Sequence, residues 1–193
     1  MKQLFLEGDK FIGKSTLLQT VLKEMALPVS GFYVERRRDE QKRIIGFELK
    51  PASELLLSEK SSAVADHCFI QMKQGKRSRN LTVFETYGCS LLQEARRSKQ
   101  VILLDEIGGV ELLSKSFMKE LYLTLNQPQK IIGVFKSDKN YQRQKQHTLE
   151  SLDIDEQRET LKEAINVADG QIRTLTEQNH QMVEAELRHF LTS

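Results

Sequence analysis

The chain has 193 residues, of which 39% are hydrophobic and 29% are charged, with a formal net charge of +2. These values are typical of a soluble globular protein and exclude a mainly disordered chain, and the near-neutral balance argues against nucleic acid or a membrane as a partner. No apolar run reaches the length of a membrane span or a signal peptide, and Cys68 and Cys89 lack the spacing of a zinc site, so we expect a cytoplasmic protein with reduced thiols.

The first elements predicted along the chain are a buried strand and an amphipathic helix. Residues 3–7 (QLFLE) form a short apolar run that is typical of a buried strand. The apolar side chains within residues 15–26 (STLLQTVLKEMA) are Leu17, Leu18, Val21, Leu22 and Met25. Their spacing places them on one face of a helix, so a strand leads directly through a short loop into a helix.

The loop between these two elements carries a phosphate-binding pattern. Residues 8–16, GDKFIGKST, fit G-x-x-x-x-G-K-[ST]. In such a loop, backbone N–H groups and the positive end of the helix dipole face the phosphates. Lys14 supplies a cation for the β- and γ-phosphates, and Ser15 supplies a hydroxyl ligand for Mg²⁺. The predicted nucleotide-binding residues are Gly8, Asp9, Lys10, Phe11, Ile12, Gly13, Lys14, Ser15 and Thr16.

The next segments predict a hairpin, a strand and a helix. Residues 29–38 and 43–50 flank the polar turn RDEQKR and form the hairpin. Residues 81–85 (LTVFE) are predicted as a strand and residues 86–97 as the helix that follows it. Two basic clusters, RRRDEQKR and KQGKRSR, either touch phosphates or nucleic acid or form a solvated hairpin tip and a solvated loop.

Residues 99–106, KQVILLDE, are predicted as the central strand. Four consecutive apolar residues suit a strand that is buried on both faces of a parallel sheet. The strand ends in Asp105, at the edge of the sheet where open α/β folds bind their ligands. Asp105 is suited to hold Mg²⁺, and Glu106 is suited to orient or deprotonate an attacking water. This pair of carboxylates favours hydrolysis over transfer to a second substrate.

The remaining sequence predicts two further strands and several helices. Residues 114–126 are helical, residues 130–135 (KIIGVF) form a strand, residues 171–175 form the last strand, and residues 176–191 form the terminal helix. The polar stretch 136–168 forms either a lid over the nucleotide, with Lys136, Arg143 or Lys145 reaching in, or a solvated helical excursion.

Together these elements predict an α/β fold. We expect a mostly parallel central sheet that is flanked by helices, with a β-hairpin excursion and the helical stretch as a candidate lid. The short connections and the absence of a proline- or glycine-rich linker predict one P-loop domain over residues 1–193.

Several segments carry a resemblance to a known family. GKSTL, GFYVE, VFE, DEIGGVEL and LTEQN occur in the order and approximate spacing of the small P-loop nucleoside-triphosphatases of the THEP1 type, and the chain resembles that family. The resemblance implies hydrolysis of nucleoside triphosphates, such as ATP and GTP, to the diphosphate and phosphate, with Mg²⁺ and broad base tolerance. It implies Lys14 and Glu106 as catalytic residues, and Ser15 and Asp105 as metal ligands.

The resemblance also marks positions outside these motifs. Glu111 matches a second acidic position of the family, where a structural role is implied. Glu35 and Arg38 fall in the region that lines the family's site. The chain departs from the family at Lys10 and Phe11, where the family loop has proline and glycine. A loop that needs a glycine conformation at residue 11 would be strained by a phenylalanine.

Two other functions remain open from the sequence. FLEGDKFIGKST is similar to the start of small nucleotide kinases, so a nucleoside or nucleotide kinase is the first alternative. The second is a nucleotide-binding module without catalysis, because Phe11, Gly109 and His180 replace residues typical of the family.

Overall fold

In the computed structural model, described over residues 1–57, 66–73, 76–148 and 150–193, eight strands form a single mixed sheet. The strands are β1 (Gln3–Glu7), β2 (Val29–Arg38), β3 (Ile44–Pro51), β4 (Cys68–Lys73), β5 (Lys76–Arg79), β6 (Val101–Ile107), β7 (Ile131–Phe135) and β8 (Gly170–Thr174). Their order in the sheet is β5-β4-β3-β2-β6-β7-β1-β8. Strand β1, which leads into the phosphate loop, is therefore separated from β6 by β7 alone, and β6 carries Asp105 and Glu106.

The sheet has a parallel part and an antiparallel part. Strands β2, β6, β7, β1 and β8 pair in parallel, and β3, β4 and β5 add antiparallel strands at the β2 edge. The apolar runs of β1, β6 and β7 are buried, as expected for strands covered on both faces. The predicted α/β class, with a mostly parallel sheet and a hairpin excursion at 29–51, is confirmed.

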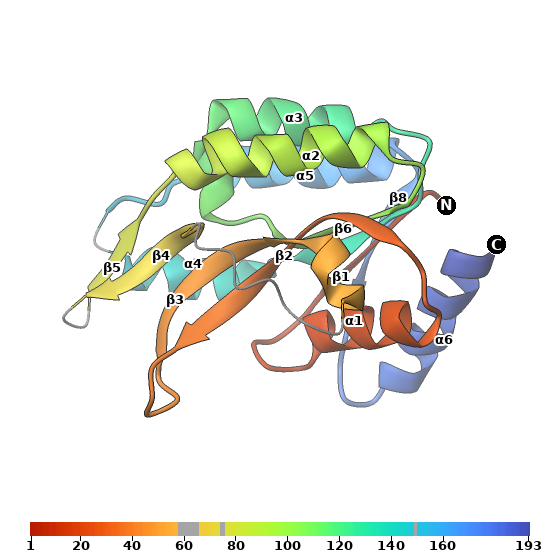
Figure 1. Ribbon diagram of the computed structural model, residues 1–193, viewed down its shortest axis with the longest axis horizontal. Coiled ribbons are helices and arrows are strands. Elements are labelled where there is room, and N and C mark those ends of the chain that lie inside the picture. The colour runs from red at the N-terminus through yellow and green to blue at the C-terminus, as the bar shows by residue number, and fades with distance from the viewer. Residues whose placement is uncertain (58–65, 74–75, 149) are drawn as a thin grey trace.

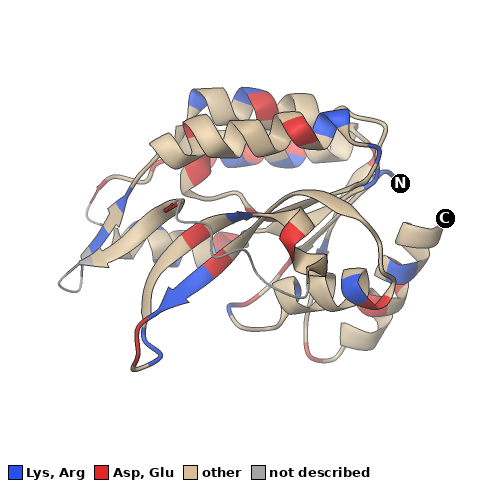
Figure 2. Ribbon diagram, in the orientation of Figure 1, with Lys and Arg blue, Asp and Glu red and all other residues tan. Residues whose placement is uncertain are grey.

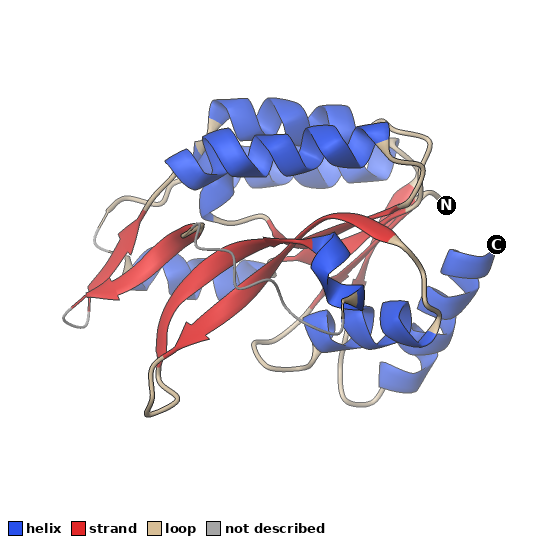
Figure 3. Cartoon of the chain, viewed as in Figure 1, coloured by secondary structure: helices blue, strands red, loops and turns tan. Residues whose placement is uncertain are grey.

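Helices cover both faces of the sheet (Figures 1 and 3). They are α1 (Lys14–Glu24), α2 (Cys89–Arg97), α3 (Lys115–Leu125), α4 (Asp138–His147), α5 (Asp155–Val167) and α6 (His180–Thr192). Apolar side chains of α2, α3 and α5 form one core with the sheet, and those of α1 and α6 form a second core on the opposite face. Both faces of the sheet are therefore covered by helices, and the loops that follow the parallel strands meet at the carboxyl edge of the sheet.

The strand predicted at residues 81–85 is wrong. This segment begins a helical turn that continues as η2 (Phe84–Gly88) and runs into α2 without a break. The buried residues Val83, Phe84, Gly88 and Leu92 recur at helical spacing, and the Phe84 ring packs against Phe69 and Phe117. Packing against the sheet therefore overrides the strand propensity of the apolar residues in this segment.

The basic segment near residue 76, predicted either to touch anions or to be a solvated loop, belongs to a second hairpin. Strands β4 and β5 pair antiparallel, with Ile70 opposite Arg79 and Met72 opposite Arg77. Beyond β7, the polar stretch 136–168 contains α4 and α5, and Leu161 and Ile165 of α5 are buried in the same core as α2 and α3. Among the described residues, no helix has the length and apolarity needed to cross a membrane.

Candidate functional site

The phosphate loop joins β1 to α1 at the carboxyl edge of the sheet. Gly8 and Gly13 have positive φ angles of 142° and 96°, in the region that favours glycine. A Cβ atom on Gly8 would lie 2.6 Å from the Leu175 carbonyl oxygen, so a larger residue would also clash there. The helix then begins directly, with the Leu17 N–H donating to the Gly13 oxygen at 2.8 Å. The strand, loop and helix predicted from the sequence are therefore present.

Lys14 lies inside the loop rather than on its surface. The side chain is buried, and Nζ donates to the backbone oxygens of Gly8 and Asp9 at 2.9 and 2.8 Å. Burial lowers the pKa of this ammonium below its usual value. The Gly8 oxygen also accepts from Asn140 Nδ2 at 3.0 Å and from Ser137 Oγ at 3.3 Å. The loop is thus held by Lys14 from within and by the start of α4 from outside.

Phe11, at the position where the sequence departs from a glycine, adopts a left-handed backbone conformation. Its φ angle is 70°, a left-handed value that costs a residue with a Cβ atom about 1–2 kcal/mol. The side chain is 66% exposed, and its ring centre lies 5.0 Å from Lys10 Nζ and 5.0 Å from Arg36 Cζ. A phenylalanine therefore takes a left-handed backbone conformation in this loop, at the cost of backbone strain.

This strain predicts an inverted order of stability at residue 11. Phe11→Gly and Phe11→Ala both remove the ring, but only alanine keeps the left-handed cost, so we expect the glycine variant to be more stable by about 1 kcal/mol. At an ordinary position alanine is the more stable of the two by about 0.5–1 kcal/mol. The same pair at Lys10, whose φ is not positive, provides the matched control. Urea unfolding of all four variants measures both differences, and a more stable Phe11→Ala would contradict the expectation.

Ser15 and Asp105 meet at the base of the loop. Ser15 Oγ donates to Asp105 Oδ1 at 2.8 Å, which joins the start of α1 to the end of β6. Asp105 is 1% exposed, burial raises its pKa to about 7, and its Oδ2 atom has no hydrogen-bond partner among the described residues. A hydroxyl beside a buried carboxylate with a free oxygen fits the oxygen ligands that Mg²⁺ prefers. These two residues are therefore suited to hold the metal.

Two further carboxylates follow along β6 and the next turn. Glu106 lines the pocket and forms an ion pair with Lys136, at the end of β7, and its peptide bond to Asp105 is cis. Glu111 is buried, and its Oε1 atom accepts from the N–H groups of Gly108 and Gly109 at 2.5 and 2.8 Å. Burial raises the pKa of Glu111. Glu106 is thus held at the cavity by Lys136, whereas Glu111 holds the turn after β6.

Arg158 of α5 joins the segments that follow β6 and β7. Although it is charged, it is 1% exposed. Its guanidinium donates to the Gly108 oxygen, to the Lys136 oxygen at 2.6 Å and to Asp138 Oδ1 at 2.8 Å. The guanidinium also lies over the rings of Phe135 and Tyr141, 5.0 and 4.6 Å from their centres. These contacts fix the backbone on both sides of the Glu106–Lys136 pair.

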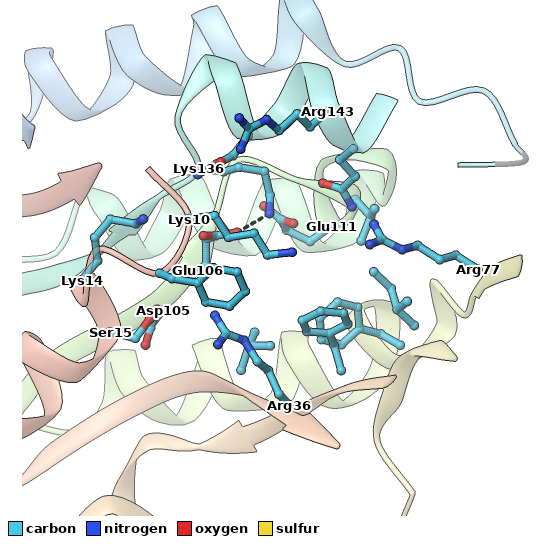
Figure 4. Close-up of a pocket in the computed structure, with 18 of the residues that line it drawn as sticks. Lys10, Lys14, Ser15, Arg36, Arg77, Asp105, Glu106, Glu111, Lys136 and Arg143 are labelled. Carbon is cyan, nitrogen blue, oxygen red and sulfur yellow. Dashed lines mark hydrogen bonds and ion pairs between the residues drawn. The ribbon is translucent and has the colours of Figure 1, made fainter. Parts of the chain in front are cut away.

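A cavity of about 500 Å³ opens beside these groups. Figure 4 shows Lys14, Ser15 and Asp105 at one end, Arg77 at the other and Glu106 between them. Apart from Phe11 of the phosphate loop, the apolar part of the lining is Val34, Phe47, Phe69, Ile70, Phe84 and Val110. The basic part of the lining is Lys10, Lys14, Arg36, Arg77, Lys136 and Arg143. The cavity therefore combines a phosphate loop, three carboxylates, an apolar wall and several cations.

The structure brings most of the predicted loop residues to this cavity. Lys10, Phe11, Gly13, Lys14, Ser15 and Thr16 line it, together with Asp105, Glu106 and Glu111. Gly8, Asp9 and Ile12 do not line it. The carbonyl oxygens of Gly8 and Asp9 face Lys14, while the Asp9 carboxylate pairs with Lys139 at 2.8 Å.

Other candidate residues divide between the cavity and the surface. Glu35 is not in its lining, whereas Val34 and Arg36 are, because side chains of a strand alternate between its two faces. Arg38 is also outside the lining. It lies at the end of β2, past a shift in the strand register, and donates to the Lys42 oxygen at 2.7 Å. Lys136 and Arg143 line the cavity as a lid would require, and α4 borders it, but Lys145 pairs with Asp153 and Asp155 instead.

Sequence reasoning missed the residues from the antiparallel strands. The sequence marks Arg77 only as one member of a basic cluster, and no pattern in it points to Phe69. Nothing in a single strand shows that it folds beside the phosphate loop. Figure 2 shows basic residues on β2, at which the antiparallel part of the sheet begins, and on β5 at the outer edge of that part. Arg96, by contrast, donates to the Glu120 oxygen at 3.1 Å at the end of α2 and does not line the cavity.

Comparisons with known proteins show the family of this chain. The model of the family described as NTPase matches residues 3–166. The "Cancer-related nucleoside-triphosphatase homolog" of Mus musculus is 34% identical over 137 residues, covering 66% of this chain and 70% of that protein. "Nucleoside-triphosphatase THEP1" of Thermotoga sp. (strain RQ2) is 28% identical over 134 residues, covering 69% and 74%. The solution structure of a human cancer-related nucleoside triphosphatase is similar in fold, with a TM-score of 0.68, 24% identity and coverage of 99% and 97%.

Proposed function

The chain belongs to the NTPase family, and from that premise we propose that it hydrolyses nucleoside triphosphates to the diphosphate and phosphate in the cavity beside the phosphate loop. The names of its curated relatives, nucleoside-triphosphatases of the THEP1 and cancer-related types, support this activity. The observation that carries the assignment of the site is the meeting of the loop, the Ser15–Asp105 pair and Glu106 at one cavity.

The phosphates would bind at the loop end of the cavity. Backbone N–H groups of the loop and the start of α1 face the bound anion there, and the helix dipole adds to the attraction. Lys14 would exchange its two backbone acceptors for the β- and γ-phosphate oxygens. All of these contacts address phosphates rather than a base, which supports tolerance of several bases.

Ser15 and Asp105 would hold Mg²⁺, which supplies charge neutralisation for the β- and γ-phosphate oxygens. The unpartnered Oδ2 atom of Asp105 supports this role, because a buried carboxylate oxygen is costly to leave without a partner. A metal ligand must be ionised, so Asp105, whose buried carboxyl has a raised pKa, would bind the cation in its deprotonated form.

Glu106 would orient the attacking water and accept its proton. It lies next to the metal pair in sequence and faces the cavity, and Lys136 holds its carboxylate in place. Lys136 also adds a second cation near the transferred phosphate, and Arg158 fixes the backbone from which Lys136 projects. Lys14, Ser15 and Asp105 would therefore bind the phosphates and the metal, and Glu106 would position the nucleophile.

Phosphate release from ATP, GTP, CTP and UTP tests this proposal. We expect release in the presence of Mg²⁺ and only background release in EDTA. Lys14→Ala is expected to lower the rate by about 100-fold or more, because it removes a fixed cation from the developing charge. The Gly8 oxygen keeps its contacts with Asn140 and Ser137, so the loop should remain folded in this variant.

Lys139→Ala is the matched control for Lys14→Ala. Lys139 is exposed and pairs with Asp9 on the outer side of the same loop, so its removal should change the rate by less than about twofold. Equal rates for Lys14→Ala and the unaltered protein would contradict the assigned role. If the unaltered protein binds no nucleotide, the loop does not hold phosphates, and the proposal is wrong.

A further inference from the structure

The cavity extends further than hydrolysis requires. In the proposed function the phosphates and the attacking water occupy the end of the cavity near Lys14, Ser15 and Glu106, whereas the cavity, of about 500 Å³, continues past Glu106 to Arg77 (Figure 4). Beyond Glu106, its wall is formed by apolar side chains of β2, β3, β4 and η2 and of the turn that follows β6. These side chains are Val34, Phe47, Phe69, Ile70, Phe84 and Val110. We call this part of the cavity, together with the arginines that border it, the distal half. Arg77 lies at its far end, and Arg36 and Arg143 lie on either side of Glu106 (Figure 4).

The distal half lies on the side from which the γ-phosphate is attacked. In phosphoryl transfer the attacking and the leaving oxygens lie roughly in line through the phosphorus. Lys14 and Ser15 mark the end that holds the leaving diphosphate, and Glu106 marks the position of the nucleophile. Figure 4 shows Glu106 between those two residues and Arg77. A molecule in the distal half would therefore meet the γ-phosphate from the attacking side.

The distal half also carries more positive charge than its own residues balance. Within the described part of the chain, Arg36, Arg77 and Arg143 have no ion pair. Burial lowers the pKa of Lys10, and the neighbouring charges of Arg77, Arg36, Lys136 and Arg143 lower it further. Such a group of cations is stabilised by a bound anion, and arginine binds phosphate with two parallel hydrogen bonds. The aromatic residues of the same wall suit a planar ring.

We propose that the distal half binds a second substrate, a small phosphomonoester that carries a planar ring, and presents it to the γ-phosphate as a phosphoryl acceptor. Nucleoside monophosphates are the representative members of this chemical class. The phosphate of the acceptor would meet Arg36, Arg77 and Arg143, and its ring would pack against Phe47, Phe69 and Phe84. The proposal rests on the proposed function, because it uses the same bound triphosphate.

The transfer step is balanced without any further reactant. An oxygen of the acceptor's phosphate forms a bond to the γ-phosphorus while the bond from that phosphorus to the β–γ bridging oxygen breaks. The electron pair of the broken bond stays on the departing nucleoside diphosphate, and the acceptor becomes a diphosphate. Because a phosphomonoester is mostly a dianion at neutral pH, no proton has to be removed from it. Water takes the same position when the acceptor is absent, and phosphate is released instead.

Binding is measured first, by calorimetry with AMP, GMP, CMP and UMP in the presence of Mg²⁺ and a saturating β,γ-imido triphosphate. We expect at least one monophosphate to bind alongside the triphosphate analogue. The matching nucleoside, which lacks the phosphate, and ribose 5-phosphate, which lacks the ring, should each bind at least about tenfold more weakly. Competition between the monophosphate and the triphosphate analogue would overturn the proposal and assign the distal half to the nucleoside of the triphosphate.

The products are measured next, by chromatography of reactions that contain a nucleoside triphosphate with and without the monophosphate. We expect two diphosphates to form at the expense of free phosphate. Arg77→Gln should raise the half-saturating monophosphate concentration by about tenfold, the effect of one charged hydrogen bond. Arg37→Gln is the control, because Arg37 pairs with Asp66 at 2.9 Å and does not line the cavity.

The two proposals fail in different ways. Phosphate release without any diphosphate of the acceptor, at saturating monophosphate, would overturn the acceptor role and leave hydrolysis intact. Equal effects of Arg77→Gln and Arg37→Gln would also overturn it. No phosphate release from the triphosphate alone, together with no transfer, would overturn the proposed function itself.

Discussion

Glu106→Gln is expected to lower kcat for nucleoside-triphosphate hydrolysis by about 10²–10⁴-fold, the range typical of a removed general base. The substitution keeps the shape of the side chain and its hydrogen-bond acceptor toward Lys136, but it removes the negative charge that orients and deprotonates water. Asp105 cannot take over this role if it is committed to Mg²⁺. The effect should therefore appear in kcat, with a small change in KM, because the contacts of Lys14 and Ser15 with the triphosphate are unchanged.

Thermal stabilisation by a triphosphate with Mg²⁺ separates loss of chemistry from loss of binding. Glu106→Gln should keep this stabilisation, since a ligand that binds only the folded state raises its stability in proportion to its affinity. Glu40→Gln, in the exposed turn between β2 and β3, removes the same charge far from the cavity and should leave kcat unchanged. A normal kcat in Glu106→Gln would show that another group positions the water.

The sequence was sufficient for the parts of the site that are local in the chain. The phosphate loop lies within nine consecutive residues, and the strand before it and the helix after it have clear apolar patterns. Asp105 and Glu106 were predictable for the same reason, because they lie next to the end of a buried parallel strand. Their meeting with Ser15 follows from the general rule that the carboxyl ends of parallel strands share one edge of the sheet.

The distal half was not predictable because its residues meet only through tertiary pairing. Arg36, Arg77 and Arg143 come from β2, β5 and α4, and no local pattern shows that these elements border one cavity. The strand prediction at residues 81–85 was wrong for a related reason. Phe84 packs between Phe69 and Phe117, which are distant in sequence, and that packing suits a helical turn. Long-range packing therefore decided both features.

Arg158 is another residue whose importance only the structure shows, and its replacement is expected to have the largest effect on stability. Arg158→Met should lower the free energy of unfolding by about 3 kcal/mol, because the Gly108 and Lys136 oxygens each lose a donor at about 1–3 kcal/mol per buried group. For a chain of this length the melting temperature should fall by about 6–12 °C. Lys162→Gln is the control: it also removes a partner of Asp138, but at the surface, where about 0.5 kcal/mol is expected.

A structural role alone would change stability and leave the chemistry untouched, so kcat must be measured well below the melting temperature. The Gly108 and Lys136 oxygens that Arg158 binds belong to the backbone on both sides of the Glu106–Lys136 pair. We therefore expect Arg158→Met to lower kcat by about tenfold, in the range of a supporting interaction that orients an active group. Arg158→Lys restores the charge but not the planar fork, so it cannot bind all three acceptors and should rescue only part of either effect. A destabilised Arg158→Met with an unchanged kcat would show that Arg158 supports the fold without positioning the carboxylate.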